Sequence, residues 1–203
     1  MINPIGDWVM REALKTAAIW QAAVEYPVSM HVNVSAHQLK QGNFLTGVVS
    51  ALADTGLPAQ ILDLEMTESA LIEDAPRAQS LLAALKGVGI RIALDDFGTG
   101  FSSLSYLKSL PVDAIKIDKS FIDDLPTGER SAALVDAILT LGERLGNDIV
   151  AEGVETQAQR DWLVEHGCRL LQGYYFSRAE PQSRFLEITG ADAGTVLGTA
   201  RAG

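Results

Sequence analysis

The sequence is poor in cysteine, in long apolar runs and in positive charge. Its 203 residues contain one cysteine, Cys168, which excludes an internal disulfide and fits a reducing compartment. No apolar run approaches the roughly 20 residues that span a membrane, so we expect no membrane insertion in this segment. Lys and Arg number 16 against 26 Asp and Glu, and the formal net charge of −10 disfavours binding to duplex nucleic acid. A phosphate ligand would therefore be held through bound cations.

Strand-like and helix-like segments alternate along the chain. Apolar runs predict strands at 28–34, 61–66, 90–96, 112–118, 147–153 and 168–174. Apolar residues three and four apart predict helices that start at Asp7 and at Asn43, and further helices over 76–86, 129–145 and 156–166. This alternation is typical of an α/β fold with a parallel sheet whose two faces are both covered.

Polar side chains recur where the predicted strands end. Any one strand-end acid is more often a turn or helix cap, but a repeated pattern indicates a ligand site, because ligands bind at this end of barrels and open α/β sheets. The residues at these strand ends or just beyond them are Asn33, Glu65, Glu68, Asp95, Asp96, Lys116, Asp118, Glu152, Glu155 and Gln172.

The oxygen-rich character of this set favours a hard divalent cation. Carboxylates that converge cannot all stay ionised without a compensating charge. Asp and Glu with an amide such as Asn33 suit Mg²⁺ or Mn²⁺ better than zinc, and the three histidines lack zinc-type spacing. Adjacent Asp95 and Asp96 could serve two ions, and two ions about 3.5–4 Å apart support in-line displacement at phosphorus.

Several roles stay open at this level. The stretch after Asp96, GTGFSSLS, is either a mobile element that closes over the site or an ordinary connection with a Ser-capped short helix. Lys116 is either an ion-pair partner or the group that orients water and offsets transition-state charge. Glu152 is either a further ligand or the general base.

The motifs around these residues resemble those of EAL-type cyclic-di-GMP phosphodiesterase domains. They are HVNVSA, LEMTES, DDFGTGFSSLSYLKSLPVDAIKIDKSFI, VAEGVET and LLQGYYFSR, and the similarity runs from Ile5 to about residue 178. The resemblance implies a TIM-type (β/α) barrel over residues 1–188, followed by a flexible tail at 189–203. It also implies that the parent protein hydrolyses cyclic di-GMP to linear pGpG with Mg²⁺ or Mn²⁺, whereas we expect this chain alone to be impaired.

The resemblance also assigns roles to the polar residues. Asn33, Glu65 and Asp95 match ligands of a first metal, and Asp95 and Asp96 match ligands of a second. Lys116 and Glu152 match the water-activating positions. Glu68 matches the glutamate that tethers the loop after the aspartates, and Gln172 matches a further active-site residue. Asp118 and Glu155 match supporting or substrate-facing positions.

One segment of the family pattern is absent from this sequence. In the family pattern the Glu-Ala-Leu motif and its nearby arginine precede the first helix, whereas Glu12-Ala13-Leu14 of this sequence falls within that helix. We therefore expect an incomplete barrel without its first two strands. An open strand edge would favour a homodimer or association with another domain. A catalytically inactive cyclic-di-GMP-binding or protein-interaction module is the alternative function. We expect a cytoplasmic location, or a cytoplasmic domain of a membrane-anchored parent.

Overall fold

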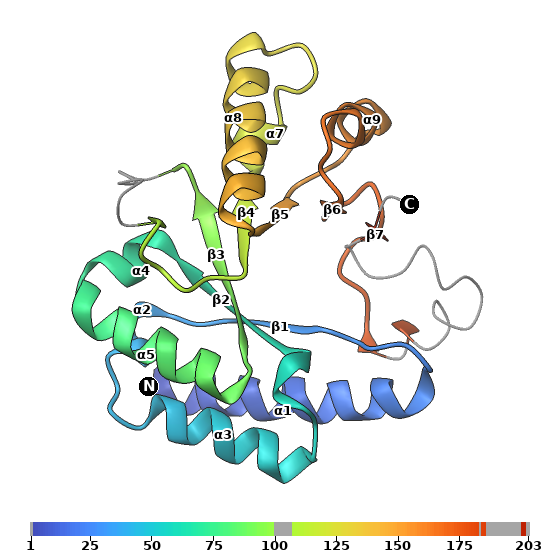
Figure 1. The fold of residues 1–203 in the computed structure, drawn as a ribbon. Helices are drawn as coiled ribbons and strands as arrows, with labels where there is room; N and C mark the ends of the chain where they lie inside the picture. The colour runs from blue at the N-terminus through green and yellow to red at the C-terminus, as the bar shows by residue number, and fades with distance from the viewer. Residues whose placement is uncertain (1, 100–106, 183, 186–199, 202–203) are drawn as a thin grey trace. The chain divides into compact units, whose positions relative to one another are not determined.

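A computed structural model describes residues 2–99, 107–182, 184–185 and 200–201, in which strands and helices alternate (Figure 1). Two compact units make up the chain. The first comprises residues 1–94 and 102–112, and the second comprises residues 95–101 and 113–203. The chain passes between them within strand β3 (Arg91–Phe97), directly before the two adjacent aspartates.

The first unit places apolar and polar residues on opposite faces of its strands. Strand β1 (Met30–Asn33) pairs in parallel with β2 (Leu62–Thr67). Leu62, Leu64 and Met66 are fully buried on one face of β2, so Asp63 and Glu65 point to the opposite face. The helices of this unit are α1 (Ile2–Ala23), α2 (Ala36–Leu39), α3 (Phe44–Thr55), α4 (Glu68–Ile72) and α5 (Ala75–Val88), and the 3₁₀ turn η1 (Ala59–Ile61) precedes β2.

The second unit repeats this arrangement. Strand β4 (Ala114–Ile117) pairs in parallel with β5 (Asp148–Ala151), which pairs in parallel with β6 (Leu170–Leu171). Helices α7 (Lys119–Ile122), α8 (Glu129–Leu145) and α9 (Gln157–Glu165) follow or connect these strands. Ile115 and Ile117 are fully buried, and α8 contacts both β4 and β5. The alternate face of β4 therefore presents Lys116.

All six predicted strands are present, and the predicted helices need two corrections. Helix α1 starts at Ile2, so the prediction that Asp7 caps its N-terminus is wrong. Helix α5 runs through Gly87 to Val88 and ends against Gly89, whose φ of +96° is a left-handed cap that glycine adopts without strain. Helices α3, α8 and α9 occupy their predicted positions.

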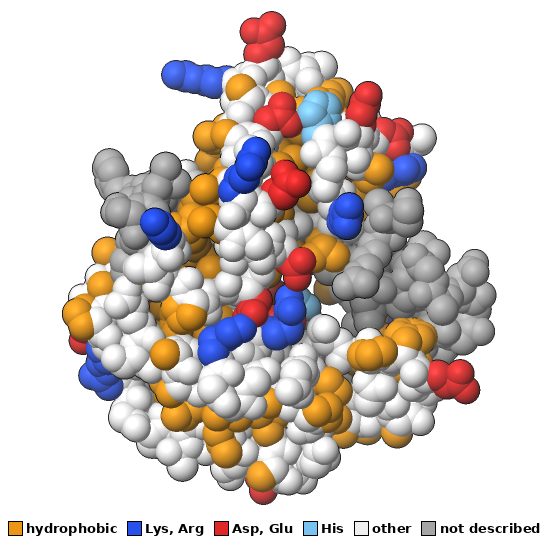
Figure 2. Space-filling view, viewed as in Figure 1, with side chains coloured by type: hydrophobic (Ala, Val, Ile, Leu, Met, Phe, Trp, Pro, Cys, Tyr) orange, Lys and Arg blue, Asp and Glu red, His pale blue; other side chains and the backbone are white. Residues whose placement is uncertain are grey.

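Apolar side chains are exposed on the helices of the first unit. On α1, Ile5, Trp8 and Ile19 are 59%, 63% and 54% exposed, and hydrophobic side chains show on the surface over α1 and α3 (Figure 2). None of the helices in the described ranges has both the length and the apolar character to cross a bilayer.

Only residues 200 and 201 of the predicted tail at 189–203 are described in the structure. Ala200–Arg201 forms β7, which pairs antiparallel with β6. The rest of 189–203 lies outside the described residues, so the boundary at 188 and the flexible tail stay predictions.

Candidate active site

Two adjacent aspartates reach one cluster because the backbone turns between them. Neighbouring side chains in a strand normally point to opposite faces of the sheet. Asp96 has a φ of +55°, in the left-handed region, which Asp adopts more readily than most residues. With this turn, Asp95, Asp96 and Glu152 can each contribute one carboxylate oxygen, and these three oxygens lie within 4.8 Å of one another. The backbone carbonyl of Asp96 accepts a hydrogen bond of 2.9 Å from the Thr99 hydroxyl, which supports the turn.

A buried ammonium lies inside this carboxylate cluster. Nζ of Lys116 is 2.7 Å from Glu152 Oε1 and 3.1 Å from Asp95 Oδ1, and the lysine side chain is only 5% exposed. Burial of an unpaired ammonium would be costly, so the two carboxylates stabilise its charged form. Lys116 thereby fixes the orientation of Glu152, whose backbone N–H donates to the carbonyl of Ile117 at 3.1 Å.

Three carboxylates and one ammonium leave this cluster with a formal charge of −2. Partial desolvation raises the pKa of Asp96, and the charges of Asp95 and Asp118 raise it further, whereas Lys116 lowers it. Asp95 Oδ1 is buried and receives no aligned hydrogen bond among the described residues, although Lys116 is at ion-pair distance. The excess negative charge and a buried oxygen lone pair fit a divalent cation, which prefers carboxylate ligands.

The predicted ligands of the first unit are neighbours across β1 and β2. Asn33 lies opposite Glu65 in the parallel register. Glu65 is 5% exposed, and its Oε1 is 2.9 Å from Nδ1 of His31. Asp63, two residues before Glu65, accepts a hydrogen bond of 3.2 Å from Arg91 Nε. Sequence reasoning missed His31, Asp63 and Arg91. Each of them lies two or four residues before a predicted ligand of the same strand, and this even spacing places the residue and the ligand on one face of the strand.

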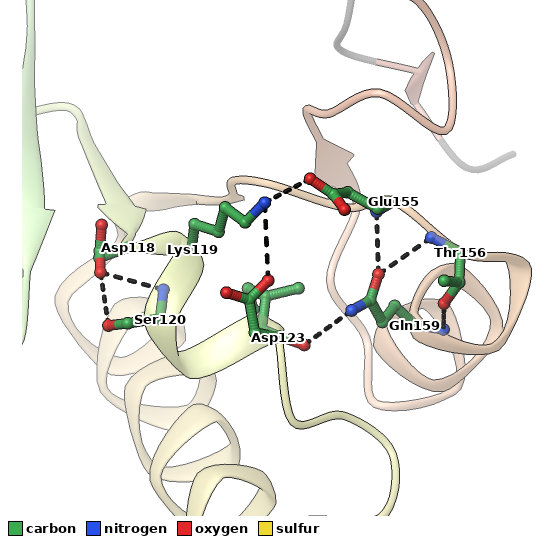
Figure 3. Close-up of polar contacts among 8 residues, drawn as sticks. Asp118, Lys119, Ser120, Asp123, Glu155, Thr156 and Gln159 are labelled. Carbon is green, nitrogen blue, oxygen red and sulfur yellow. Dashed lines mark hydrogen bonds and ion pairs between the residues drawn. The ribbon is translucent and has the colours of Figure 1, made fainter.

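Asp118 and Glu155 take part in a polar network that joins α7 to the segment after β5 (Figure 3). Asp118 caps α7, and its carboxylate accepts from the backbone N–H of Ser120 at 3.0 Å. Lys119 forms ion pairs with Asp123 and Glu155. These contacts stabilise the backbone around two predicted site positions.

Gln159 completes this network from the first turn of α9. Its side-chain oxygen accepts from the backbone N–H groups of Glu155 at 2.8 Å and Thr156 at 3.0 Å. Its Nε2 donates to the carbonyl of Ile122 at 3.1 Å. Thr156 and Gln159 thus form a capping box, in which the Thr156 hydroxyl accepts from the Gln159 backbone N–H. The sequence TQAQ carries this signal, which sequence reasoning did not use.

The remaining predicted residues lie near these strand ends. Glu68 is buried at the start of α4, directly after β2. Gln172 is exposed after β6, and its backbone N–H donates to the Ala151 carbonyl at 2.8 Å. Residues 100–105 of the predicted mobile element lie outside the described residues, so the element and its tether to Glu68 stay predictions.

Comparison with known proteins decides the family. The EAL domain family model matches residues 1–179. The chain belongs to the EAL domain family. "Cyclic di-GMP phosphodiesterase NbdA" of Pseudomonas aeruginosa is 40% identical over 188 residues, which is 93% of this chain and 24% of that protein.

Two solved structures are similar to this chain in fold and sequence. The PaMucR phosphodiesterase in complex with c-di-GMP has a TM-score of 0.87 and 41% identity, covering 90% of this chain and 74% of that one. Klebsiella pneumoniae BlrP1 in complex with manganese and c-di-GMP has a TM-score of 0.75 and 30% identity, covering 85% of this chain and 44% of that one.

The fold prediction is therefore confirmed. This EAL domain has the α/β fold of an incomplete TIM-type barrel, and its described residues form six parallel strands, β1 to β6, where a complete barrel has eight. The chain spans about a quarter of the length of the curated relatives it matches, such as 23% and 24% of the first two. The activities of these longer proteins are therefore only proposed for this chain.

Proposed function

We propose that this EAL domain hydrolyses one phosphodiester bond of cyclic di-GMP to give linear pGpG, in the presence of Mg²⁺ or Mn²⁺. The observation that carries the proposal is the cluster of Asp95, Asp96 and Glu152 around buried Lys116. Relatives named as phosphodiesterases, and a neighbour whose structure contains manganese and c-di-GMP, support it.

Asp95 and Asp96 are the proposed cation ligands of this cluster. Both offer carboxylate oxygens from one strand end. The motifs assign Asn33 and Glu65 as further ligands, and their adjacent positions on β1 and β2 agree with a shared role. Divalent cations bound by these residues would supply Lewis acidity toward the phosphate and lower the pKa of bound water.

Lys116 and Glu152 are the proposed groups that handle water and charge. In hydrolysis a water oxygen forms a bond to phosphorus, and the bond from phosphorus to the ribose 3′-oxygen breaks. Glu152, whose carboxylate lies 2.7 Å from the Lys116 ammonium, is the group that we propose takes the water's proton. The 3′-oxygen that leaves takes a proton from solvent. The Lys116 ammonium offsets the negative charge that develops on the phosphate oxygens.

Partners and location belong to the same proposal. Cyclic di-GMP is the proposed ligand, and the cytoplasm is the proposed site of the reaction. Association with a second copy or with another domain would cover the edge of β1, which begins the sheet order.

Cyclic di-GMP turnover by the purified chain tests the proposal. Linear product is followed by chromatography with Mg²⁺ and then with Mn²⁺. Asp95→Asn keeps the side-chain shape but removes a ligand charge, and we expect at least about a 100-fold loss of rate. Asp136→Asn makes the same change at an exposed position of α8 and should leave the rate unchanged. Equal rates for Asp95→Asn and wild type would sink the proposal. Tight binding without cleavage would favour a binding module instead.

A further inference from the structure

His31 begins the HVNVSA motif, two residues before Asn33, and neither the resemblance nor the proposed chemistry gives it a role. It lies on β1 opposite Asp63, and its Nδ1 is 2.9 Å from Glu65 Oε1. Its Nε2 is 3.8 Å from Asp63 Oδ2. The imidazole therefore lies between two acids whose side chains are each only 6% exposed.

The strand register explains how His31 reaches Glu65. His31 and Asn33 share one face of β1, and Asp63 and Glu65 share the corresponding face of β2. Asn33 and Glu65 form the layer nearer the carboxyl ends of the strands, and His31 and Asp63 form the layer beneath. The imidazole ring spans the step between layers, whereas an alanine at residue 31 would leave that step open.

The contact has a defined polarity. A carboxylate that ligates a cation has no hydrogen to donate, so in the proposed site Nδ1 donates in the 2.9 Å contact and Glu65 Oε1 accepts. A donor fixed to one oxygen restricts rotation of the carboxylate plane about its last side-chain bond. Asp63 accepts from Arg91 at 3.2 Å, which holds the next acid in place beside the ring.

We propose that His31 is a positioning residue that orients the Glu65 carboxylate for a divalent cation. The inference rests on the proposed function, because it takes Glu65 as a metal ligand. Hydrogen-bond partners of metal ligands typically contribute about 10- to 100-fold to metal affinity or activity. We place His31 at the lower end, because its side chain is 41% exposed and solvent weakens the contact.

Mn²⁺ binding to the substrate-free chain tests this role without relying on turnover. Titration calorimetry should show about tenfold weaker binding for His31→Ala. His31→Asn places an amide N–H near the position of Nδ1, and it should restore most of the affinity. His37→Ala, at an exposed position of α2, should bind Mn²⁺ like wild type.

Thermal melting of the metal-free variants separates positioning from packing. A lower melting temperature for His31→Ala with unchanged Mn²⁺ affinity would overturn the positioning role. Equal weakening by Ala and Asn would overturn it as well, because the donor would then be irrelevant.

Asp95→Asn distinguishes failure of this inference from failure of the proposed function. If wild type binds Mn²⁺, Asp95→Asn abolishes binding and His31→Ala changes nothing, only the role of His31 is wrong. If wild type binds no Mn²⁺, or Asp95→Asn binds as wild type does, the proposed metal centre is wrong and the role of His31 falls with it.

Discussion

Replacing Gln159 by leucine should lower the free energy of unfolding by about 3 kcal/mol. The buried amide makes three hydrogen bonds to backbone groups, at 2.8 Å to Glu155, 3.0 Å to Thr156 and 3.1 Å to Ile122. Each such bond contributes about 1 kcal/mol net, and a buried group left unpaired costs a comparable amount or more. Leucine is similar in size to glutamine, so cavity formation adds little to the loss.

Urea unfolding followed by circular dichroism measures this change. The matched control is Gln157→Leu, an exposed position on the same helix, which should stay within about 0.5 kcal/mol of wild type. We also expect a lower hydrolysis rate for Gln159→Leu, because the segment after Glu152 loses the hydrogen bonds of the Gln159 side chain that Figure 3 draws. A destabilisation below about 1 kcal/mol would refute the view that this amide stabilises the segment.

Three further predictions test the geometry. Asp96→Gly relieves a φ of +55°, so it should raise the free energy of unfolding of the metal-free chain by about 0.5–1 kcal/mol. The same change removes a proposed metal ligand and should abolish hydrolysis. A lower melting temperature than that of wild type would contradict this reasoning. Gly173→Ala should cost at least about 3 kcal/mol in urea unfolding, because the new Cβ would lie 2.1 Å from the Val154 carbonyl oxygen. Gly167→Ala, with open space around its Cβ and a φ of +85°, should cost only about 1–2 kcal/mol, and equal losses would refute the clash. Burial raises the pKa of the Cys168 thiol to about 11 from an ordinary 9.0, so at pH 8 an aromatic disulfide reagent should react about 100-fold more slowly than with the unfolded chain. Equal rates in the two states would show that the thiol is accessible.

The strand pattern was predictable because burial and periodicity act locally. Each apolar run that ends in a polar residue became a strand with that residue at or near its end. The adjacent aspartates and Lys116 could be assigned to one cluster for the same reason, since parallel strands bring their carboxyl ends together.

Features that depend on tertiary contacts were not predictable in the same way. The predicted helix over 76–86 stops one residue before Gly87, but α5 continues to Val88, because buried Leu82 and Leu85 hold the helix in place and Gly89 provides the left-handed cap. The left-handed turn at Asp96 has no signal in hydrophobic periodicity. It is this turn that lets both aspartates face Glu152.

The contacts around His31 were predictable only in part. Alternation on β1 and β2 places His31 and Asp63 on the same faces as Asn33 and Glu65, and that could have been read from the sequence. The register between the two strands, which sets the 2.9 Å contact, required the structure.

Turnover of cyclic di-GMP by the wild-type chain with Mn²⁺ is the most direct measurement. The chain is first shown to be folded by circular dichroism and to bind the nucleotide, and the reaction is then followed by chromatography with Mn²⁺ or with a chelator. We predict linear pGpG with Mn²⁺ and none with the chelator. A folded chain that binds cyclic di-GMP with Mn²⁺ present and leaves it uncut would contradict the assignment of Asp95, Asp96, Lys116 and Glu152 to catalysis.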